Sequence, residues 1–218
     1  MESLHVQPVS PYPFSTPSSR YLTHLHSPAD FLQSFLKSQW TTLPYPTHSF
    51  SGQTIIVTGG NVGLGLEAAR HFVRLGAKKV ILGCRSQSKG LAAKALIAQT
   101  TKGDAEVEVW HVDLSSYESV REFCAKAAQL ERLDVVIENA GIAVPTYEEF
   151  EGMECTITVN VISAFFMALL LLPKLRADAV KFNMVPRLTI VASDAHEQVC
   201  TSHIHYPSTL SFYNYLSC

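Results

Sequence analysis

The sequence is poor in charge and in cysteine. Charged residues make up 17% of its 218 residues, and the formal net charge is only -2 at pH 7. This balance gives no basis for binding nucleic acid or an anionic membrane surface. The five cysteines stand without paired spacing, which argues against a disulfide framework and suits a reducing compartment; they are Cys84, Cys124, Cys155, Cys200 and Cys218.

Long apolar segments are also lacking. The apolar run from Ala164 to Leu172 is too short to span a bilayer, and the N-terminus has neither a basic start nor an uninterrupted apolar stretch. Hydrophobic residues nevertheless make up 47% of the chain. That share, in a chain of this length, is typical of one globular core with room for an appendage. We therefore expect a soluble, cytoplasmic protein.

The first 50 residues differ in composition from the rest. Prolines recur up to Pro28 with serine and threonine between them, which indicates a loosely ordered extension. One amphipathic piece, Asp30 to Trp40, predicts a short helix with Phe31 and Phe35 on one side. We expect a Pro/Ser-rich extension over 1–50, a globular domain over 51–198 and an atypical tail over 199–218.

From Gln53 onward, strand and helix patterns alternate. Strands are predicted at 54–58, 79–83, 106–110, 134–137 and 188–191. Helices are predicted at 64–75, 87–100 and 117–130, and a long apolar helix ends near Arg176. A capping-box pattern, Ser115-Ser116-Tyr117-Glu118, precedes the third helix. Such alternation predicts an α/β fold with a doubly wound parallel sheet between two helical layers.

A glycine-rich turn, Thr58-Gly59-Gly60-Asn61-Val62-Gly63-Leu64-Gly65, joins the first strand to the first helix. The helix end offers free N–H groups and a partial positive charge. Gly59, Gly63 and Gly65 carry no Cβ, so the backbone could approach a pyrophosphate closely. Taken alone, the run also fits an ordinary turn that needs positive φ angles.

Four further landmarks follow the turn in order; they are Cys84-Arg85, Asp113-Leu114-Ser115, Asn139-Ala140-Gly141, and Asn160 with Val191-Ala192-Ser193 beyond it. With these five landmarks, the chain over about 30–198 resembles the short-chain dehydrogenase/reductase family, and most nearly its filamentous-fungal reductases with extended N-termini. The resemblance implies a Rossmann-type NAD(P)-binding domain over 51–198. It also implies an oxidoreductase acting on a ketone or secondary alcohol, in secondary metabolism, and places Asn61 and Leu64 in the cofactor turn.

The residues after the second strand favour NADP(H). A family member that uses NAD would carry an acid there for the ribose 2′-hydroxyl, and the sequence has Cys84-Arg85 instead. A guanidinium can pair with a 2′-phosphate, and Lys89 adds a second positive charge. The alternative for Arg85 is a solvated loop charge. The missing acid also argues against an S-adenosylmethionine methyltransferase, which shares the glycine turn.

The resemblance assigns roles to the later landmarks. Asp113 would accept a hydrogen bond from the adenine amino group, although Asp113-Leu114-Ser115 also fits local helix capping. Asn139, Ala140 and Gly141 would lie against the cofactor ribose, with Glu138 in place of the family's usual first Asn.

Two residues are candidates for the catalytic site through the same resemblance. Asn160 would bend its helix and hold a water of the proton relay; a buried structural amide with satisfied partners is the alternative. Ser193 would hydrogen-bond the substrate oxygen and polarise it. The apolar helix 160–175 would need burial on more than one side, as in a homo-oligomer.

The family's acid–base pair, Tyr-x-x-x-Lys, occurs nowhere in the sequence. Tyr206 follows Ser193 at a plausible distance, but Leu210 occupies the lysine position. We therefore expect a chain truncated after the fifth strand, with the C-terminal third of the family's fold missing. The rival hypothesis is a cofactor-binding remnant or regulatory partner without turnover.

The tail over 199–218 contains no Asp, Glu, Lys or Arg and no matching period. One hypothesis is translation of an unspliced intron beginning at Val199-Cys200, which sequencing of the transcript would test. Cys200, His203 and His205 could also bind a metal, but their spacing fits no closed site, so no metal is expected.

Overall fold

The computed structural model describes residues 36–37, 40, 42 and 44–192. The chain divides into two units, Met1–Tyr45 and Pro46–Cys218. Of the first unit, Leu36 and Lys37 are helical. The rest of the predicted helix over 30–40 lies almost wholly outside the described residues, as does the tail over 199–218.

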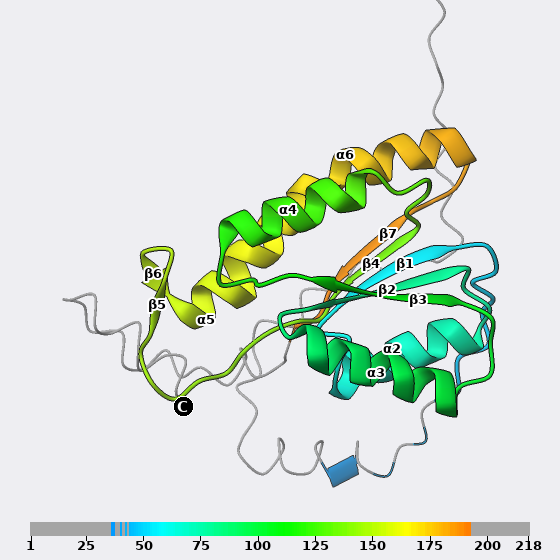
Figure 1. Cartoon of the computed structure of the whole chain (residues 1–218), viewed down its shortest axis with the longest axis horizontal. Coiled ribbons are helices and arrows are strands. Elements are labelled where there is room, and N and C mark those ends of the chain that lie inside the picture. Colours follow the sequence, from blue (N-terminus) through cyan, green and yellow to red (C-terminus); the bar gives the residue numbers. More distant parts are fainter. Residues whose placement is uncertain (1–35, 38–39, 41, 43, 193–218) are drawn as a thin grey trace, which may run out of the picture. The chain divides into compact units, whose positions relative to one another are not determined.

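A five-stranded parallel sheet forms the centre of the second unit (Figure 1). Its strands are β1 (Thr54–Thr58), β2 (Lys79–Cys84), β3 (Glu106–His111), β4 (Val135–Glu138) and β7 (Arg187–Ile190), in the order β3-β2-β1-β4-β7. All five predicted strands are confirmed to within a residue or two. The strand order changes direction at β1, so a crevice forms between the loops that follow β1 and β4.

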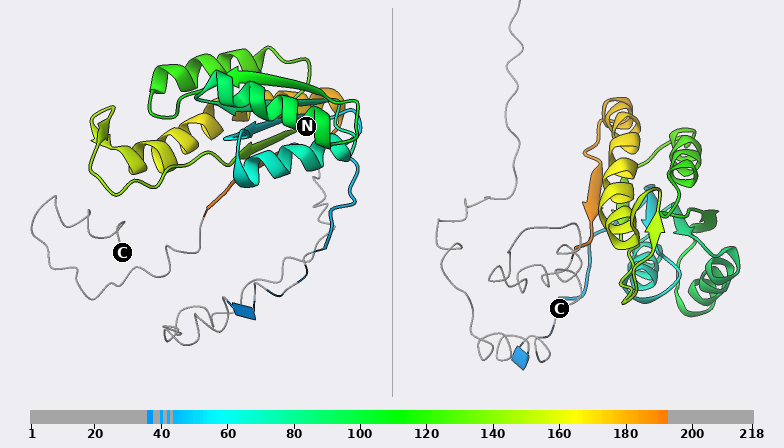
Figure 2. Two further views of the ribbon diagram at one scale, coloured as in Figure 1. Left: turned by 60° about the horizontal axis from the view of Figure 1, so that its bottom comes forward. Right: turned by 90° about the vertical axis from the view of Figure 1, so that its left-hand side faces the viewer.

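Helices cover both faces of the sheet (Figures 1 and 2). On one face, α2 (Gly63–Arg74) and α3 (Gln87–Thr100) pack on a core that includes Ile55, Val57 and Leu82. On the other, α4 (Tyr117–Ala128) and α6 (Ala164–Phe182) pack on a second core. The α/β, Rossmann-type, three-layer architecture expected from the alternation is therefore confirmed.

The connection from β4 to α6 contains structure that the sequence analysis did not predict. A two-stranded hairpin, β5 (Glu149–Phe150) and β6 (Met153–Glu154), leads into the short helix α5 (Cys155–Ile157). A π-helical segment, η2 (Thr158–Ser163), then joins α5 to α6. π-Helical turns are frequently found at functional sites.

The last helix is longer than predicted. The expected end near Arg176 is wrong, because α6 continues to Phe182. The true stop is Asn183, whose left-handed conformation (φ 48°) caps the helix. Asp178 fixes the added turns, since its carboxylate accepts hydrogen bonds from the Leu133 N–H (2.7 Å) and from Lys174 (3.0 Å).

The continuous helical stretch Cys155–Phe182 is long and apolar enough to cross a membrane, judged by length and composition alone. The core helix of a globular domain passes the same test, and Met167, Leu171 and Leu175 of this stretch are buried in the core beside α4. Other apolar side chains of α6, notably Phe165 and Leu169, are exposed among the described residues.

Candidate functional site

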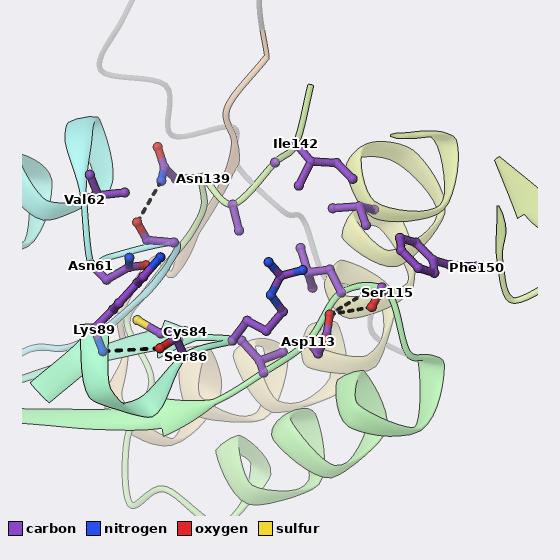
Figure 3. A pocket seen from close by; sticks show the side chains of 18 residues that line it. Asn61, Val62, Cys84, Ser86, Lys89, Asp113, Ser115, Asn139, Ile142 and Phe150 are labelled. Atoms are coloured by element: carbon purple, nitrogen blue, oxygen red, sulfur yellow. Dashed lines mark hydrogen bonds between the residues drawn. The ribbon is translucent and has the colours of Figure 1, made fainter. Parts of the chain in front are cut away.

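A cleft of about 370 Å³ opens at the carboxyl ends of the parallel strands (Figure 3). It brings together eight of the predicted cofactor-binding residues, namely Gly59, Asn61, Arg85, Lys89, Asp113, Asn139, Ala140 and Gly141. Gly63, Leu64 and Gly65 form the first turn of α2 next to this cleft.

The glycine turn needs glycine for two different reasons. Gly59 and Gly63 have φ angles of +65° and +58°, a backbone conformation that residues with a Cβ atom rarely adopt. At Gly65 the reason is space, because an added Cβ would lie 2.5 Å from both the Gly59 oxygen and the Asn139 amide nitrogen. The turn therefore keeps its backbone close to α2 and open toward the cleft.

The N-terminus of α2 is bare of side-chain caps. Its capping residue, Val62, makes no side-chain hydrogen bond, and its first turn holds no acid. By contrast, Ser86 caps α3 and Ser116 caps α4 through their hydroxyl oxygens. The N–H groups that open α2 thus lack the usual protein acceptor and can bind an anion. A pyrophosphate fits this site.

Thr58 ties the turn to the loop after β4. Its hydroxyl oxygen accepts hydrogen bonds from the backbone N–H groups of Asn139 and Ala140, each at 3.1 Å. The Asn139 amide in turn donates to the Thr58 carbonyl at 3.1 Å. The two sides of the cleft between β1 and β4 are therefore bonded directly to each other.

Two cations lie beyond β2, Arg85 in the loop that follows the strand and Lys89 in the first turn of α3. Arg85 and Lys89 are exposed, and neither takes part in any ion pair of the described residues. Ser86 lies between them and accepts a hydrogen bond from the Lys89 N–H at 3.4 Å. This arrangement can bind a phosphate monoester from the cleft side.

Asp113 forms hydrogen bonds within its own loop and also lines the cleft. Its Oδ1 atom accepts from the Ser115 N–H (2.9 Å) and the Ser115 hydroxyl (2.7 Å), and its N–H donates to Ser119 Oγ (2.9 Å). Asp113 thus closes a local turn before α4, while the cap of the helix itself is Ser116. This turn leaves Oδ2 without a hydrogen bond among the described residues, so this oxygen can accept from a bound base.

Asn160 lies in the π-helical segment and is exposed, whereas the sequence suggested a buried amide. Its Oδ1 atom accepts from the Ile142 N–H at 2.8 Å, and its Nδ2 donates to the Ile142 carbonyl at 2.7 Å. The side chain therefore fixes the loop after Gly141. Ser193, the other predicted catalytic residue, lies outside the described residues.

Glu138 is the least expected group near the site. It is 4% exposed at the end of β4, and neither carboxylate oxygen has a hydrogen-bond partner among the described residues. Burial raises the pKa of this carboxyl to about 8. The buried Cys124 thiol lies close by, and its pKa is raised to about 12, first by burial and then by the Glu138 charge. Glu138 is therefore mostly protonated at neutral pH.

Comparison with known proteins assigns the chain to a family. A model of the family described as short chain dehydrogenase matches residues 53–209. This chain belongs to the short-chain dehydrogenase/reductase family. The match includes the glycine turn and every described residue of the cleft.

Curated fungal relatives support the assignment. The chain is 52% identical over 165 residues to the short chain dehydrogenase/reductase dmxR8 of Cryptosporiopsis sp., covering 74% of this chain and 51% of that protein. It is 49% identical over 169 residues to the short chain dehydrogenase atnD of Emericella nidulans, covering 77% and 54% respectively. The chain thus spans about half the length of the curated relatives it matches.

Solved structures agree with the observed fold. The oxidoreductase yciK from E. coli superposes with a TM-score of 0.57 at 26% identity, over 71% of this chain and 63% of that one. A metagenomic short-chain oxidoreductase in complex with NADP gives a TM-score of 0.52 at 28% identity, over 59% and 58%.

The structure of this short-chain dehydrogenase/reductase domain also adds cleft residues that the sequence analysis missed. Thr58, the first residue of the glycine-rich turn, was assigned no role from the sequence, although its hydroxyl joins the two sides of the cleft. The lining residues that were not predicted include Val62, Cys84, Leu114 and Ser115, which stand inside family landmarks. Outside the landmarks are Gly83, Ser86, Val112, Ile142, Phe150 and Val159. Among the described residues no group of metal-binding side chains occurs, and Cys200, His203 and His205 lie outside them.

Proposed function

We propose that the protein is an NADP(H)-dependent oxidoreductase that acts on a ketone or a secondary alcohol. The observation that carries the proposal is the pair of cations beyond β2, Arg85 and Lys89, together with Cys84-Arg85-Ser86, which supplies no acid after this strand to hold a ribose 2′-hydroxyl. Solved relatives described as NADP complexes support the same choice.

Each part of the cleft then has a task. The bare first turn of α2 would hold the pyrophosphate, and Arg85 and Lys89 would pair with the 2′-phosphate. Oδ2 of Asp113 would accept from the adenine amino group. The loop Asn139–Gly141, fixed by Thr58 and Asn160, would lie against the ribose. When bound, the nicotinamide supplies or takes up the hydride.

The residues proposed for the substrate are Asn160 and Ser193. The Asn160 side chain is hydrogen-bonded to both the N–H and the carbonyl of Ile142. Asn160 would therefore act by orienting the loop that contains Ile142. Ser193 would donate a hydrogen bond to the substrate oxygen as negative charge develops on it. For turnover the oxygen must also gain or lose a proton, and the sequence printed here holds no Tyr-x-x-x-Lys to move it.

The missing Tyr-x-x-x-Lys pair supports a second candidate function. The 218-residue chain would bind NADP(H) without turnover, as a cofactor-binding remnant or as a regulatory partner. A phenol without a nearby ammonium keeps a pKa of about 10 and is a slow proton donor at neutral pH.

Two further expectations belong to the proposal. The exposed apolar residues of α6, among them Phe165 and Leu169, would contact a second copy of the chain. A cytoplasmic location is proposed from the charge balance and from Cys84, Cys124 and Cys155, which are all unpaired and buried.

Binding and turnover are tested separately. Thermal unfolding with NADPH and with NADH should show a larger stabilisation by NADPH. Equal increases in melting temperature with the two nucleotides would contradict the NADP(H) assignment. No increase with either nucleotide would contradict cofactor binding. Consumption of NADPH with a panel of ketones would then separate the two candidates, because a flat trace with a bound cofactor favours the non-catalytic one.

A further inference from the structure

The β5–β6 hairpin forms one end wall of the cleft. Phe150, from β5, lines the cleft together with Leu114 and Val159, both of which are buried. Figure 3 shows Phe150 at the opposite end of the cleft from Asn61 and Val62 of the glycine turn. The end with Phe150 therefore presents an aromatic ring, while the other end presents the side chains of Asn61 and Val62 beside the glycine turn.

The hairpin is fixed to its neighbours at several points. Oε1 of Glu151 accepts a hydrogen bond from the Tyr117 N–H at 2.9 Å, at the start of α4, where a carboxylate is favoured. The Thr158 hydroxyl donates to the carbonyl of Phe150 at 3.0 Å. Glu151 also has a φ of 54°, an unfavourable conformation for a residue with a side chain. A strained turn held by its own side chain indicates that the position of the hairpin matters.

The cofactor chemistry determines what this end would hold. If Arg85 and Lys89 bind the 2′-phosphate, the ribose that carries this phosphate lies beside them. The adenine is bonded to that same ribose, so it must lie within one nucleoside of Arg85. Arg85, Asp113 and Phe150 line the same cleft, and a flat purine ring can lie against an aromatic side chain.

We propose that Phe150 contacts the nucleobase of the bound nucleotide and selects a purine, and that Glu151 is a positioning residue that holds the hairpin on α4. This inference rests on the proposed function. An aromatic ring recognises the π-face of a base, while Oδ2 of Asp113 recognises its amino group.

Two nucleotides without nicotinamide test the proposal, 5′-AMP and 5′-CMP, with binding measured by calorimetry on the full chain. The variants are Phe150→Ala, Phe150→Tyr and, as a matched control, Met153→Ala, which removes an exposed side chain of the same hairpin. Phe150→Ala should weaken 5′-AMP binding about tenfold and reduce the preference for 5′-AMP over 5′-CMP. Phe150→Tyr keeps the ring and should retain both the affinity for 5′-AMP and the preference over 5′-CMP. Met153→Ala should retain both as well.

Glu151→Gly tests the positioning role. Glycine adopts the positive φ without strain and removes the side chain together with its carboxylate, so the hairpin can keep its turn but loses its bond to the Tyr117 N–H. The preference for 5′-AMP should fall while the melting temperature changes little. Unchanged preference in this variant would overturn the role of Glu151.

The outcomes separate this inference from the proposed function. Wild-type protein that binds NADPH, together with a Phe150→Ala variant that binds 5′-AMP equally well, overturns the inference alone. An equal loss for 5′-AMP and 5′-CMP would also overturn it, because the ring would then be structural. Wild-type protein that binds none of these nucleotides would overturn both proposals.

Discussion

The side-chain amide nitrogen of Asn139 lies 2.5 Å from the point where a Cβ atom on Gly65 would stand. Asn139 has little room to retreat, because its amide donates to the Thr58 carbonyl and its backbone N–H donates to the Thr58 hydroxyl. The start of α2 and the loop after β4 therefore fit together only while residue 65 has no side chain.

Gly65→Ala should therefore destabilise the domain and weaken NADPH binding. The expected loss in the free energy of unfolding is about 1–3 kcal/mol, the usual cost of overpacking, measured by urea titration. Gly63→Ala is the matched control, since nothing lies within 4 Å of its Cβ position and only its positive φ is unfavourable. A Gly65→Ala protein as stable as the wild type would contradict the close packing.

Arg85→Ala should lower the affinity for NADPH and leave that for NADH unchanged. A charge-assisted hydrogen bond contributes about 1.5–3 kcal/mol, which corresponds to a loss of ten- to a hundredfold by calorimetry. Arg121→Ala serves as the control, because Arg121 is exposed on α4 and pairs only with Glu118 in the ion pairs described. Equal losses for both nucleotides would instead give Arg85 a general electrostatic role.

Glu138→Gln should change how stability depends on pH. The pKa of Glu138 is about 8 in the folded protein and near 4.5 when unfolded, so its contribution is favourable below about pH 4.5 and is lost as the pH rises through 8. The glutamine variant cannot ionise and should be more stable than the wild type at pH 9, by about 3–5 kcal/mol. Urea titrations at pH 5, 7 and 9 measure the difference.

Glu131→Gln is the control for that series, because Glu131 is exposed and its substitution should leave the slope with pH almost unchanged. If the wild type and Glu138→Gln lose stability in parallel between pH 5 and pH 9, the carboxyl of Glu138 must have a partner or solvent access in the folded state.

Asn160→Asp should loosen the loop after Gly141. One carboxylate oxygen can still accept from the Ile142 N–H, but the other faces the Ile142 carbonyl and can no longer donate to it. At pH 7 the free energy of unfolding should fall by about 1–3 kcal/mol. Part of this stability should return at pH 4, where the carboxyl takes up a proton. Asn160→Ala has no such repulsion and should show no recovery at low pH.

The sheet and its helices were predictable because each strand and helix has its own local period. Strands such as Thr54–Thr58 are short apolar runs, and helices such as Tyr117–Ala128 begin at a polar cap. The end of α6 was missed because helical residues continue past Arg176, and the signal that stops them is the left-handed Asn183.

Parts of the site depend on contacts between distant residues, and a local pattern does not contain them. The role of Thr58 follows from the pairing of β1 with β4, which places Thr58 opposite Glu138 and next to Asn139. The hairpin that carries Phe150 has strands of only two residues, too short for a period of two to be recognised. The turn between them, Glu151-Gly152, has glycine at only one of its two positive-φ positions.

The bonds made by Thr58 have a mechanical consequence. One hydroxyl oxygen holds two successive N–H groups of the loop after β4, so the phosphate-facing turn and the ribose-facing loop must shift as a single body. A ligand that displaces one side of the crevice should therefore displace the other side as well.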